Sequence, residues 1–216
     1  MTVAPSRTTS RAAQAARTRQ RLIDAAVQLF SANNYDDVAV ADIAREAKVA
    51  HGLLFHYFGS KSQIYLAAIQ FAADEITGSF TVQEGLSPGQ QLREALVRHF
   101  RYLASHRGLA LRLALAGPGA GQSAWEIFES TRLHAVQWIA LILDLPPPSP
   151  AMQMMWRACI GAIDEAALFW LRHDEPFAVE DIVDSVVDIM ATAMRAAARL
   201  DPTLDVEPAV EKMLHP

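Results

Sequence analysis

The sequence predicts an all-α protein of nine helices. Apolar residues recur at the three- and four-residue spacing of a helix face along most of the chain. Sustained alternation of apolar and polar residues, which marks a strand, is nearly absent, and Ala, Leu, Arg and Glu dominate. With 216 residues, 51% of them hydrophobic, the chain is long enough to bury a sizeable core.

Capping and breaking residues set the helix boundaries. Asn33 and Asn34 end the first helix, because Asn tolerates the left-handed conformation that follows a helix C-terminus. Ser60 and Ser149 are N-cap candidates for two long helices, and Pro150 suits a first helical position. The expected helices cover residues 15–31, 40–47, 50–58, 61–80, 88–105, 109–116, 123–144, 150–173 and 179–200.

The charge of the chain is unevenly distributed. The net charge is −5, yet residues 1–61 carry eight Arg or Lys against five Asp or Glu, and the first 23 residues contain no acid. This pattern suggests that only the N-terminal part contacts phosphates. We expect residues 1–14 to form a disordered basic arm.

The remaining composition favours a soluble cytoplasmic protein with no membrane partner. Cys159 is the only cysteine, which excludes an intrachain disulfide and fits a reducing compartment. The N-terminus lacks the apolar stretch of a signal peptide. The longest apolar run, residues 138–143, is far shorter than the roughly 20 residues that cross a bilayer.

Residues 40–58 predict a helix-turn-helix motif. The turn at residues 47–49 has the length that holds two short helices at a fixed angle. The spacing places five residues in the small core between them: Ile43, Ala44, Val49, Leu54 and Phe58. The rest of the second helix then forms an outer surface crowded with aromatic and hydrogen-bonding side chains, which suits a helix in the major groove of DNA.

Individual residues of this surface have distinct expected roles. His51 lies near the helix start and can reach base edges, Gly52 permits close approach of the backbone, and Leu53 suits a thymine methyl group. Tyr57 and Lys61 are placed for phosphates. The predicted DNA-binding residues are Arg17, Ala39, Val40, Ala50, His51, Gly52, Leu53, Phe55, His56, Tyr57 and Lys61.

Residues 21–69 resemble the DNA-binding domain of the tetracycline repressor (TetR) family. The matching residues are AA at 25–26, LF at 29–30, IA at 43–44, the G-x-L-F-x-Y-F run at 52–58 and SK at 60–61. The resemblance implies a nine-helix fold, with a three-helix DNA-binding domain over 15–60 and a helical ligand-binding and dimerisation domain over 61–205. It also implies a homodimer formed through the last two long helices, and a double-stranded DNA operator.

Several residues depart from the family pattern. Lys48 stands where the family usually has Gly, which predicts a slightly strained turn. Ala39 and Ala50 replace the usual Ser or Thr, and Phe55 replaces a Tyr. These replacements remove hydroxyl groups that would bond phosphates.

The body contains candidates for an apolar pocket. Its aromatic and Met side chains are either core and dimer packing or pocket lining. We predict that an apolar effector contacts Phe100, Leu103, Leu113, Phe128, Met155, Cys159 and Ile163. Four polar residues in apolar helical stretches either anchor a ligand's polar group or have structural partners: His99, Arg112, His134 and Asp164.

The sequence therefore predicts a ligand-responsive transcriptional regulator, a repressor that a small apolar molecule releases from a palindromic operator. The resemblance implies that this signal passes from helix 109–116 to helix 61–80. One alternative is a helical adaptor whose N-terminal domain binds another protein; the basic arm opposes it, and replacing Tyr57 and Lys61 would distinguish the two. The other alternative, an enzyme, lacks any G-x-S-x-G, C-x-x-C, H-E-x-x-H or P-loop motif. We expect no catalytic residue, metal or cofactor.

Overall fold

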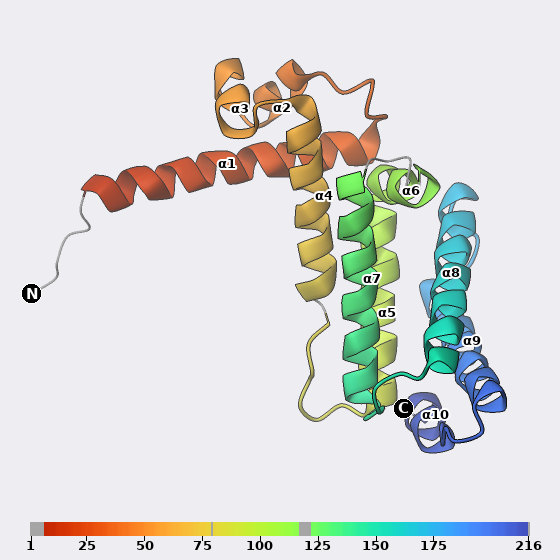
Figure 1. The fold of residues 1–216 in the computed structure, drawn as a ribbon. Helices are drawn as coiled ribbons and strands as arrows, with labels where there is room; N and C mark the ends of the chain where they lie inside the picture. The colour runs from red at the N-terminus through yellow and green to blue at the C-terminus, as the bar shows by residue number, and fades with distance from the viewer. Residues whose placement is uncertain (1–6, 79, 117–121, 216) are drawn as a thin grey trace, which may run out of the picture. The chain divides into compact units, whose positions relative to one another are not determined.

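The computed structural model describes residues 7–78, 80–116 and 122–215, without the side chains of residues 7–10 and 112–116. This part of the chain contains α-helices and no strand, which confirms the all-α prediction (Figure 1). The helices are α1 (Arg7–Ala32), α2 (Val40–Glu46), α3 (His51–Phe58), α4 (Lys61–Gly78), α5 (Pro88–Ser105), α6 (Arg107–Ala116), α7 (Gln122–Ile142), α8 (Pro150–Arg172), α9 (Val179–Leu200) and α10 (Glu207–Leu214).

The first helix begins earlier than expected. We expected a disordered arm over residues 1–14, but α1 starts at Arg7 and residues 7–14 are helical. The reason is local: this stretch is rich in Ala, Arg and Gln, which are good helix formers, and it contains no Gly or Pro. Residues 1–6 of the expected arm lie outside the described residues.

The last helix, α10, corrects the expected number of helices from nine to ten among the described residues. Pro208 occupies its first turn, where a missing N–H is tolerated. The helix packs against α5 and α9. Arg93 of α5 donates from Nη1 to the carbonyl oxygen of Met213 at 2.9 Å, which places a cation at the C-terminus of α10.

The expected caps of two long helices are present. The Ser60 hydroxyl accepts a hydrogen bond from the Gln63 amide at 3.2 Å. The Ser149 hydroxyl accepts one from the Met152 amide at 3.4 Å, and a proline occupies the first turn of α8. Both long helices therefore begin where their capping residues predict.

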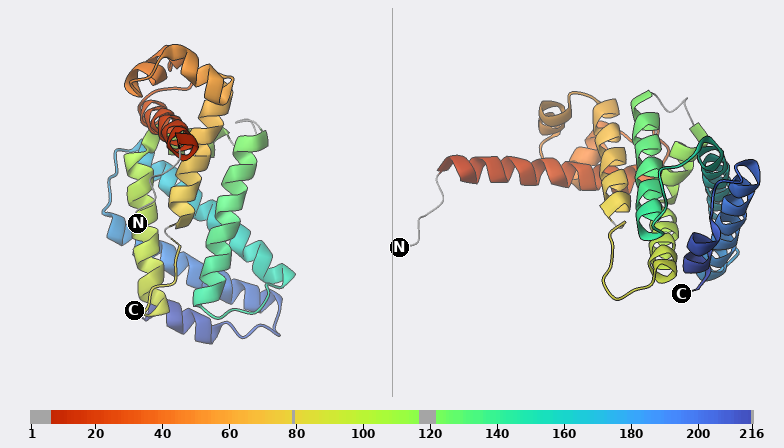
Figure 2. Two further views of the ribbon diagram at one scale, coloured as in Figure 1. Left: turned by 90° about the vertical axis from the view of Figure 1, so that its left-hand side faces the viewer. Right: turned by 60° about the horizontal axis from the view of Figure 1, so that its bottom comes forward.

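The contacts divide the chain into two compact units. The first contains residues up to Ala72 together with His106–Arg112. Within it α2 packs against α1 and α3, and the N-terminal half of α1 projects past them with residues 11–17 exposed (Figures 1 and 2). The fully buried side chains of this unit include Leu22, Ala26, Phe30, Ile43, Leu54 and Ile64.

Within the first unit, the start of α6 packs closely against the end of α1. A Cβ atom on Gly108 would lie 2.0 Å from the carbonyl oxygen of Ser31. Real Cβ atoms essentially never approach another atom within 3.0 Å, so only glycine fits this contact without movement of the backbone.

The second unit contains Ala73–Ser105 and Leu113–Pro216. Helices α8 and α9 pack side by side along their lengths, and α5 packs against α9 and α10. The core includes Phe100, whose ring packs edge-on against that of Trp170 with the two ring centroids 5.8 Å apart. None of the helices in the described residues combines the length and apolar character that a bilayer span requires.

Candidate nucleic-acid interface and body cavities

The turn between α2 and α3 closes through a left-handed residue. Lys48 has a φ of 55°, the Lys48 amide donates to Arg45 O at 3.0 Å, and the Val49 amide donates to Ala44 O at 3.0 Å. This pair of bonds is a Schellman motif, whose left-handed position is usually Gly because it has no Cβ. The strain that the sequence predicts for this turn therefore lies in the φ angle of Lys48.

Replacing Lys48 with glycine should stabilise the protein by up to about 1 kcal/mol. The left-handed conformation costs a residue with a Cβ roughly 1–2 kcal/mol, and the greater freedom of glycine in the unfolded chain cancels part of that gain. Chemical denaturation of both proteins measures the difference. A lower free energy of unfolding for Lys48→Gly would contradict this explanation.

The outward face of α3 carries the side chains that the spacing places there. His51, Gly52 and His56 are exposed, and Tyr57 is half-buried. Leu53 and Phe55 are 37% and 46% exposed, so two large apolar side chains of this short helix face solvent. Leu54 and Phe58 face the core instead. The arrangement gives one short helix a protruding, aromatic-rich surface whose contact with DNA stays a prediction.

Lys61 is held by a residue that the sequence analysis did not select. Its ammonium group lies 4.4 Å from the centroid of the Tyr35 ring and donates to the Asp36 carbonyl oxygen at 3.4 Å. Tyr35 in turn packs against Phe30 and Tyr65. The three rings therefore position the lysine at the start of α4. In the sequence, the only sign of this contact was an aromatic residue directly after Asn33 and Asn34.

Helices α2 and α3 both begin without a side-chain cap. Ala39 and Ala50 occupy the N-cap positions, and neither forms a capping hydrogen bond. The first amides of both helices, including that of Val40, therefore need an outside acceptor such as water or phosphate. Arg17 is exposed on α1, with Nε 3.4 Å from the Ala13 carbonyl oxygen of its own helix.

Two neighbouring cavities lie in the second unit. The smaller has a volume of about 50 Å³ and is lined by Val136, Ile139, Trp156, Cys159, Ile160, Ile163, Met190 and Met194. The larger has a volume of about 370 Å³ and is lined by Glu129, Arg132, Leu133, Val136, Pro148, Gln153, Trp156, Arg157 and Ile160. Three residues, Val136, Trp156 and Ile160, line both cavities.

The predicted effector contacts occupy different places in this unit. Cys159 and Ile163 line the smaller cavity, and burial raises the pKa of the Cys159 thiol to about 11. The Arg132 guanidinium lies over the Phe128 ring, with its Cζ atom 4.1 Å from the ring centroid. Phe100 belongs to the core. Leu103 and Met155 are half-buried and line neither cavity, and the side chains of Leu113 and Arg112 lie outside the described residues.

A half-buried ion-pair network joins α7 to α8 beside the larger cavity. Arg132 donates to Glu129 Oε1 at 2.6 Å and to Asp164. The pKa of Asp164 is raised because burial outweighs the attraction of the Arg132 guanidinium. Asp164, one of the four ambiguous polar residues, therefore has a structural partner. No group of His, Cys, Asp and Glu within the described ranges is arranged to hold a metal ion.

His99 is a second polar residue of the ambiguous set that the structure places. The residue as a whole is half-buried, but its Nδ1 atom is shielded from solvent and has no hydrogen-bond partner among the described residues. Burial lowers the pKa of His99 from 6.5 to about 4. The folded protein thus keeps this imidazole neutral.

His99 should make the protein less stable in mild acid. Below pH 6.5 the unfolded chain binds a proton that the folded chain excludes until about pH 4, so stability falls as the pH decreases through that window. Between pH 7 and pH 5 the loss should be about 2 kcal/mol. Between pH 7 and pH 5, the free energy of unfolding of His99→Gln should fall by about 2 kcal/mol less than that of the wild type. Urea denaturation at the two pH values measures both losses. An unchanged pH dependence in the variant would refute the assignment.

Two models of known families match the chain. Residues 22–68 match bacterial regulatory proteins of the tetR family, and residues 88–194 match a tetracyclin repressor-like C-terminal domain. The two matches together cover more than two thirds of the chain. They fall on α1–α4 and on the helices from α5 to α9.

Relatives and solved structures agree with these matches. The fatty acid metabolism regulator protein of Bacillus subtilis is 23% identical over 186 residues, which are 81% of this chain and 94% of that protein. A tetR-family transcriptional regulator from Streptomyces coelicolor has a TM-score of 0.80 at 28% identity, covering 91% of this chain and 88% of that one. FadR from Bacillus subtilis in complex with stearoyl-CoA has the same fold, with a TM-score of 0.64 at 20% identity over 79% and 96% of the chains.

Proposed function

Because the chain belongs to the TetR family and is a ligand-responsive DNA-binding transcriptional regulator, we propose that it is a homodimeric repressor. In this proposal it binds a palindromic operator and is released by an apolar small molecule. The relatives found include proteins named as transcriptional regulators and one named as a regulator of fatty acid metabolism.

The observation that carries the proposal is the exposed face of α3. Its apolar side chains, Leu53 and Phe55, lose solvent contact only if another surface covers them. The helix is eight residues long, which suits the major groove, about 12 Å wide. His51 and His56 are both exposed on this helix and supply hydrogen-bonding groups for base edges.

Phosphate contacts would surround this helix. The uncapped amides at the starts of α2 and α3 are donors without a side-chain acceptor. Lys61, held over Tyr35, supplies a preorganised cation. The projecting half of α1 is a helix, and helices are too wide for the minor groove of about 6 Å. We therefore propose that Arg17 contacts phosphates along the backbone rather than inside that groove.

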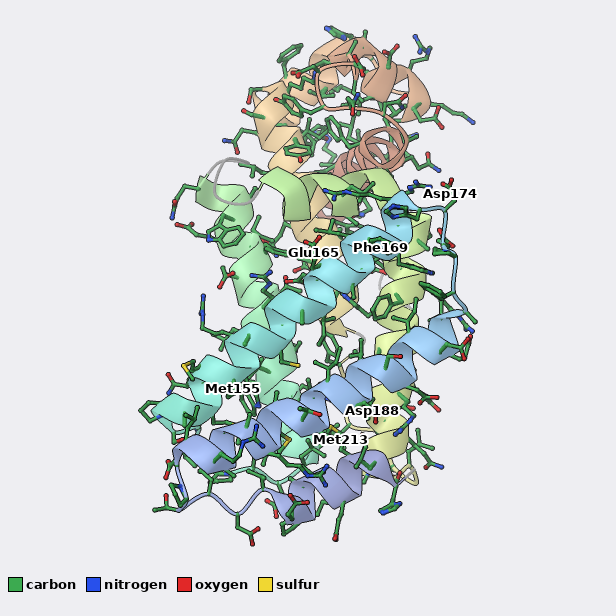
Figure 3. The ribbon with its side chains drawn as sticks, turned by 90° about the vertical axis from the view of Figure 1, so that its right-hand side faces the viewer. Met155, Glu165, Phe169, Asp174, Asp188 and Met213 are labelled. Carbon is green, nitrogen blue, oxygen red and sulfur yellow. The ribbon has the colours of Figure 1, made fainter. Side chains whose placement is uncertain are left out.

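The dimer interface of the proposal is an exposed stripe along α8 and α9. We call it the α8–α9 stripe and define it by Met154, Ala158, Gly161, Ala162, Glu165, Phe169, Ser185, Ile189 and Thr192, all exposed. Figure 3 views this side, with Glu165 and Phe169 labelled on α8. Phe169 is 50% exposed, and the space in front of Gly161 is empty. A second copy packed on the stripe would cover its apolar side chains.

Release would require that ligand binding changes the arrangement of the DNA-binding unit. The start of α6 is fixed to the end of α1 at Gly108 and Ser31. We propose that an effector in the second unit moves α6, and that this contact passes the shift to α1. An effector that binds only the arrangement with the wrong half-site spacing would then reduce the DNA-bound population.

A DNA-binding titration tests the proposal. The purified full chain is titrated into a labelled palindrome from the region upstream of its own gene, with a scrambled duplex as control. We expect binding at nanomolar to micromolar protein that resists competitor DNA and weakens steeply with salt. Equal affinity for the scrambled duplex would rule out the proposed operator function.

A further inference from the structure

The two cavities of the second unit have opposite chemistry. The smaller one is lined entirely by side chains without a formal charge or amide, among them Ile139, Ile163 and Met190. A charged group placed there would lose its hydration and find no opposite charge in return. The larger one is within the usual size range of ligand pockets and has charged groups on its wall. The residues that line both cavities therefore join them into one candidate site with an apolar end and a polar end.

The polar end has more hydrogen-bond donors than acceptors. Arg132 already donates to Glu129 and Asp164, and its Nε has no acceptor among the described residues. The Arg157 side chain is 79% exposed, and its Nη2 lies 3.7 Å from Glu129 Oε2, beyond hydrogen-bond distance. The Arg132 Nε is shielded from solvent, so only the exposed Arg157 guanidinium is available to a ligand, and an oxyanion would bind it more closely than Glu129 does.

The geometry points to an amphiphile with an oxyanion head and an unbranched alkyl tail as the ligand of this site. The carboxylate or phosphate head binds Arg157 in the larger cavity, and the tail passes Val136 and Ile160 towards the smaller one. The assignment rests on the proposed function, since it names the chemical class of the effector. Both heads share the oxyanion that an arginine recognises.

The apolar part of this site and the proposed dimer interface use different faces of α8. The lining residues Trp156, Ile160 and Ile163 follow one another at helical spacing on the side towards α7 and α9. Gly161 and Phe169 lie on the exposed side. The tail therefore leaves the α8–α9 stripe uncovered, and Arg157, three residues after Met154 and four before Gly161, places the head at the edge of the stripe.

Calorimetry with four probes of equal chain length tests the head. Dodecanoate and dodecyl phosphate carry the oxyanion, dodecanol is neutral, and dodecyltrimethylammonium is a cation; all are used below their micelle concentrations, without DNA. We expect both oxyanions to bind at least about tenfold more tightly than dodecanol, the gain of one charge-assisted hydrogen bond. The relative affinities of carboxylate and phosphate distinguish the two sources.

Two variants and a chain-length series test the site itself. Arg157→Ala should weaken dodecanoate about tenfold and leave dodecanol unchanged, whereas Arg172→Ala, another exposed arginine of α8, should change neither. Each added methylene should strengthen carboxylate binding about fourfold while the apolar end fills. Val136→Phe, which narrows the junction, should abolish that gain for the longer chains.

Several results would overturn the assignment. These are equal binding of dodecanol and dodecanoate, preference for the cation, or an Arg157→Ala effect that is the same for both head groups. Operator binding measured in parallel distinguishes failure of the ligand site from failure of the proposed function. A protein that binds its operator but no oxyanion amphiphile refutes the site alone. One that binds dodecanoate as expected but no operator refutes the proposed function and leaves the site standing.

Discussion

Replacing Gly161 with arginine should convert the protein to monomers and lower its affinity for the operator by about 10²–10⁴-fold. Gly161 lies in the middle of the α8–α9 stripe with nothing within 4 Å of its Cβ position. A long side chain there would hold a second α8 away from the stripe. A monomer loses the gain from binding two half-sites at once. Analytical ultracentrifugation and fluorescence anisotropy measure the two effects.

Glu211→Arg on α10 is the matched control. Glu211 is exposed and lies outside the α8–α9 stripe, so adding the same side chain there should leave the dimer intact. Gly161→Ala should also remain dimeric or weaken the dimer only slightly. A Gly161→Arg protein that sediments as a dimer and binds the operator like the wild type would show that the interface lies elsewhere.

Replacing Gly108 with alanine should lower the free energy of unfolding by about 3 kcal/mol, the upper range for forcing extra volume into a packed site. The added Cβ would meet both Ser31 O at 2.0 Å and Ser31 C at 2.7 Å, and backbone atoms cannot turn aside as a side chain can. For a chain of this size the melting temperature should fall by roughly 6–12 °C. Differential scanning calorimetry measures the change.

Gly52→Ala serves as the control for Gly108→Ala. It is also a helical glycine, but its Cβ position has nothing within 4 Å, so the substitution should stabilise the fold by up to about 1 kcal/mol. The same variant should weaken DNA binding if the α3 backbone approaches the duplex closely. Equal melting temperatures for Gly108→Ala and the wild type would mean that α6 shifts away from α1 at little cost.

Most helices were predictable because their signals are local. Long amphipathic patterns define α8 and α9, Ser149 caps α8, and both helices begin where the sequence predicts. The two misplaced ends of the chain lacked such signals. The sequence of residues 7–14 has no apolar stripe that would mark it as helix. Helix α10 is only two turns long and depends on a hydrogen bond from Arg93, more than a hundred residues away.

The same distinction applies to the candidate sites. The outward face of α3 follows from the spacing of Leu54 and Phe58, whose burial leaves the other residues exposed except for the half-buried Tyr57. The contact of Lys61 with Tyr35 joins residues far apart in the sequence, and so does that of Arg132 with Asp164. The cavities depend on how α7, α8 and α9 pack, which no local pattern encodes. Cys159 and Ile163 line the smaller cavity, and their contact with an effector stays a prediction.

Methylation interference on the operator tests most directly whether a pair of α3 helices enters the major groove. Dimethyl sulfate modifies guanine N7, which faces the major groove, and adenine N3, which faces the minor groove. We predict that guanine methylation blocks binding at two symmetrically placed clusters, separated by about one helical turn or a multiple of it. Interference at a single cluster, or only at adenines, would contradict the paired major-groove contact on which the proposed function depends.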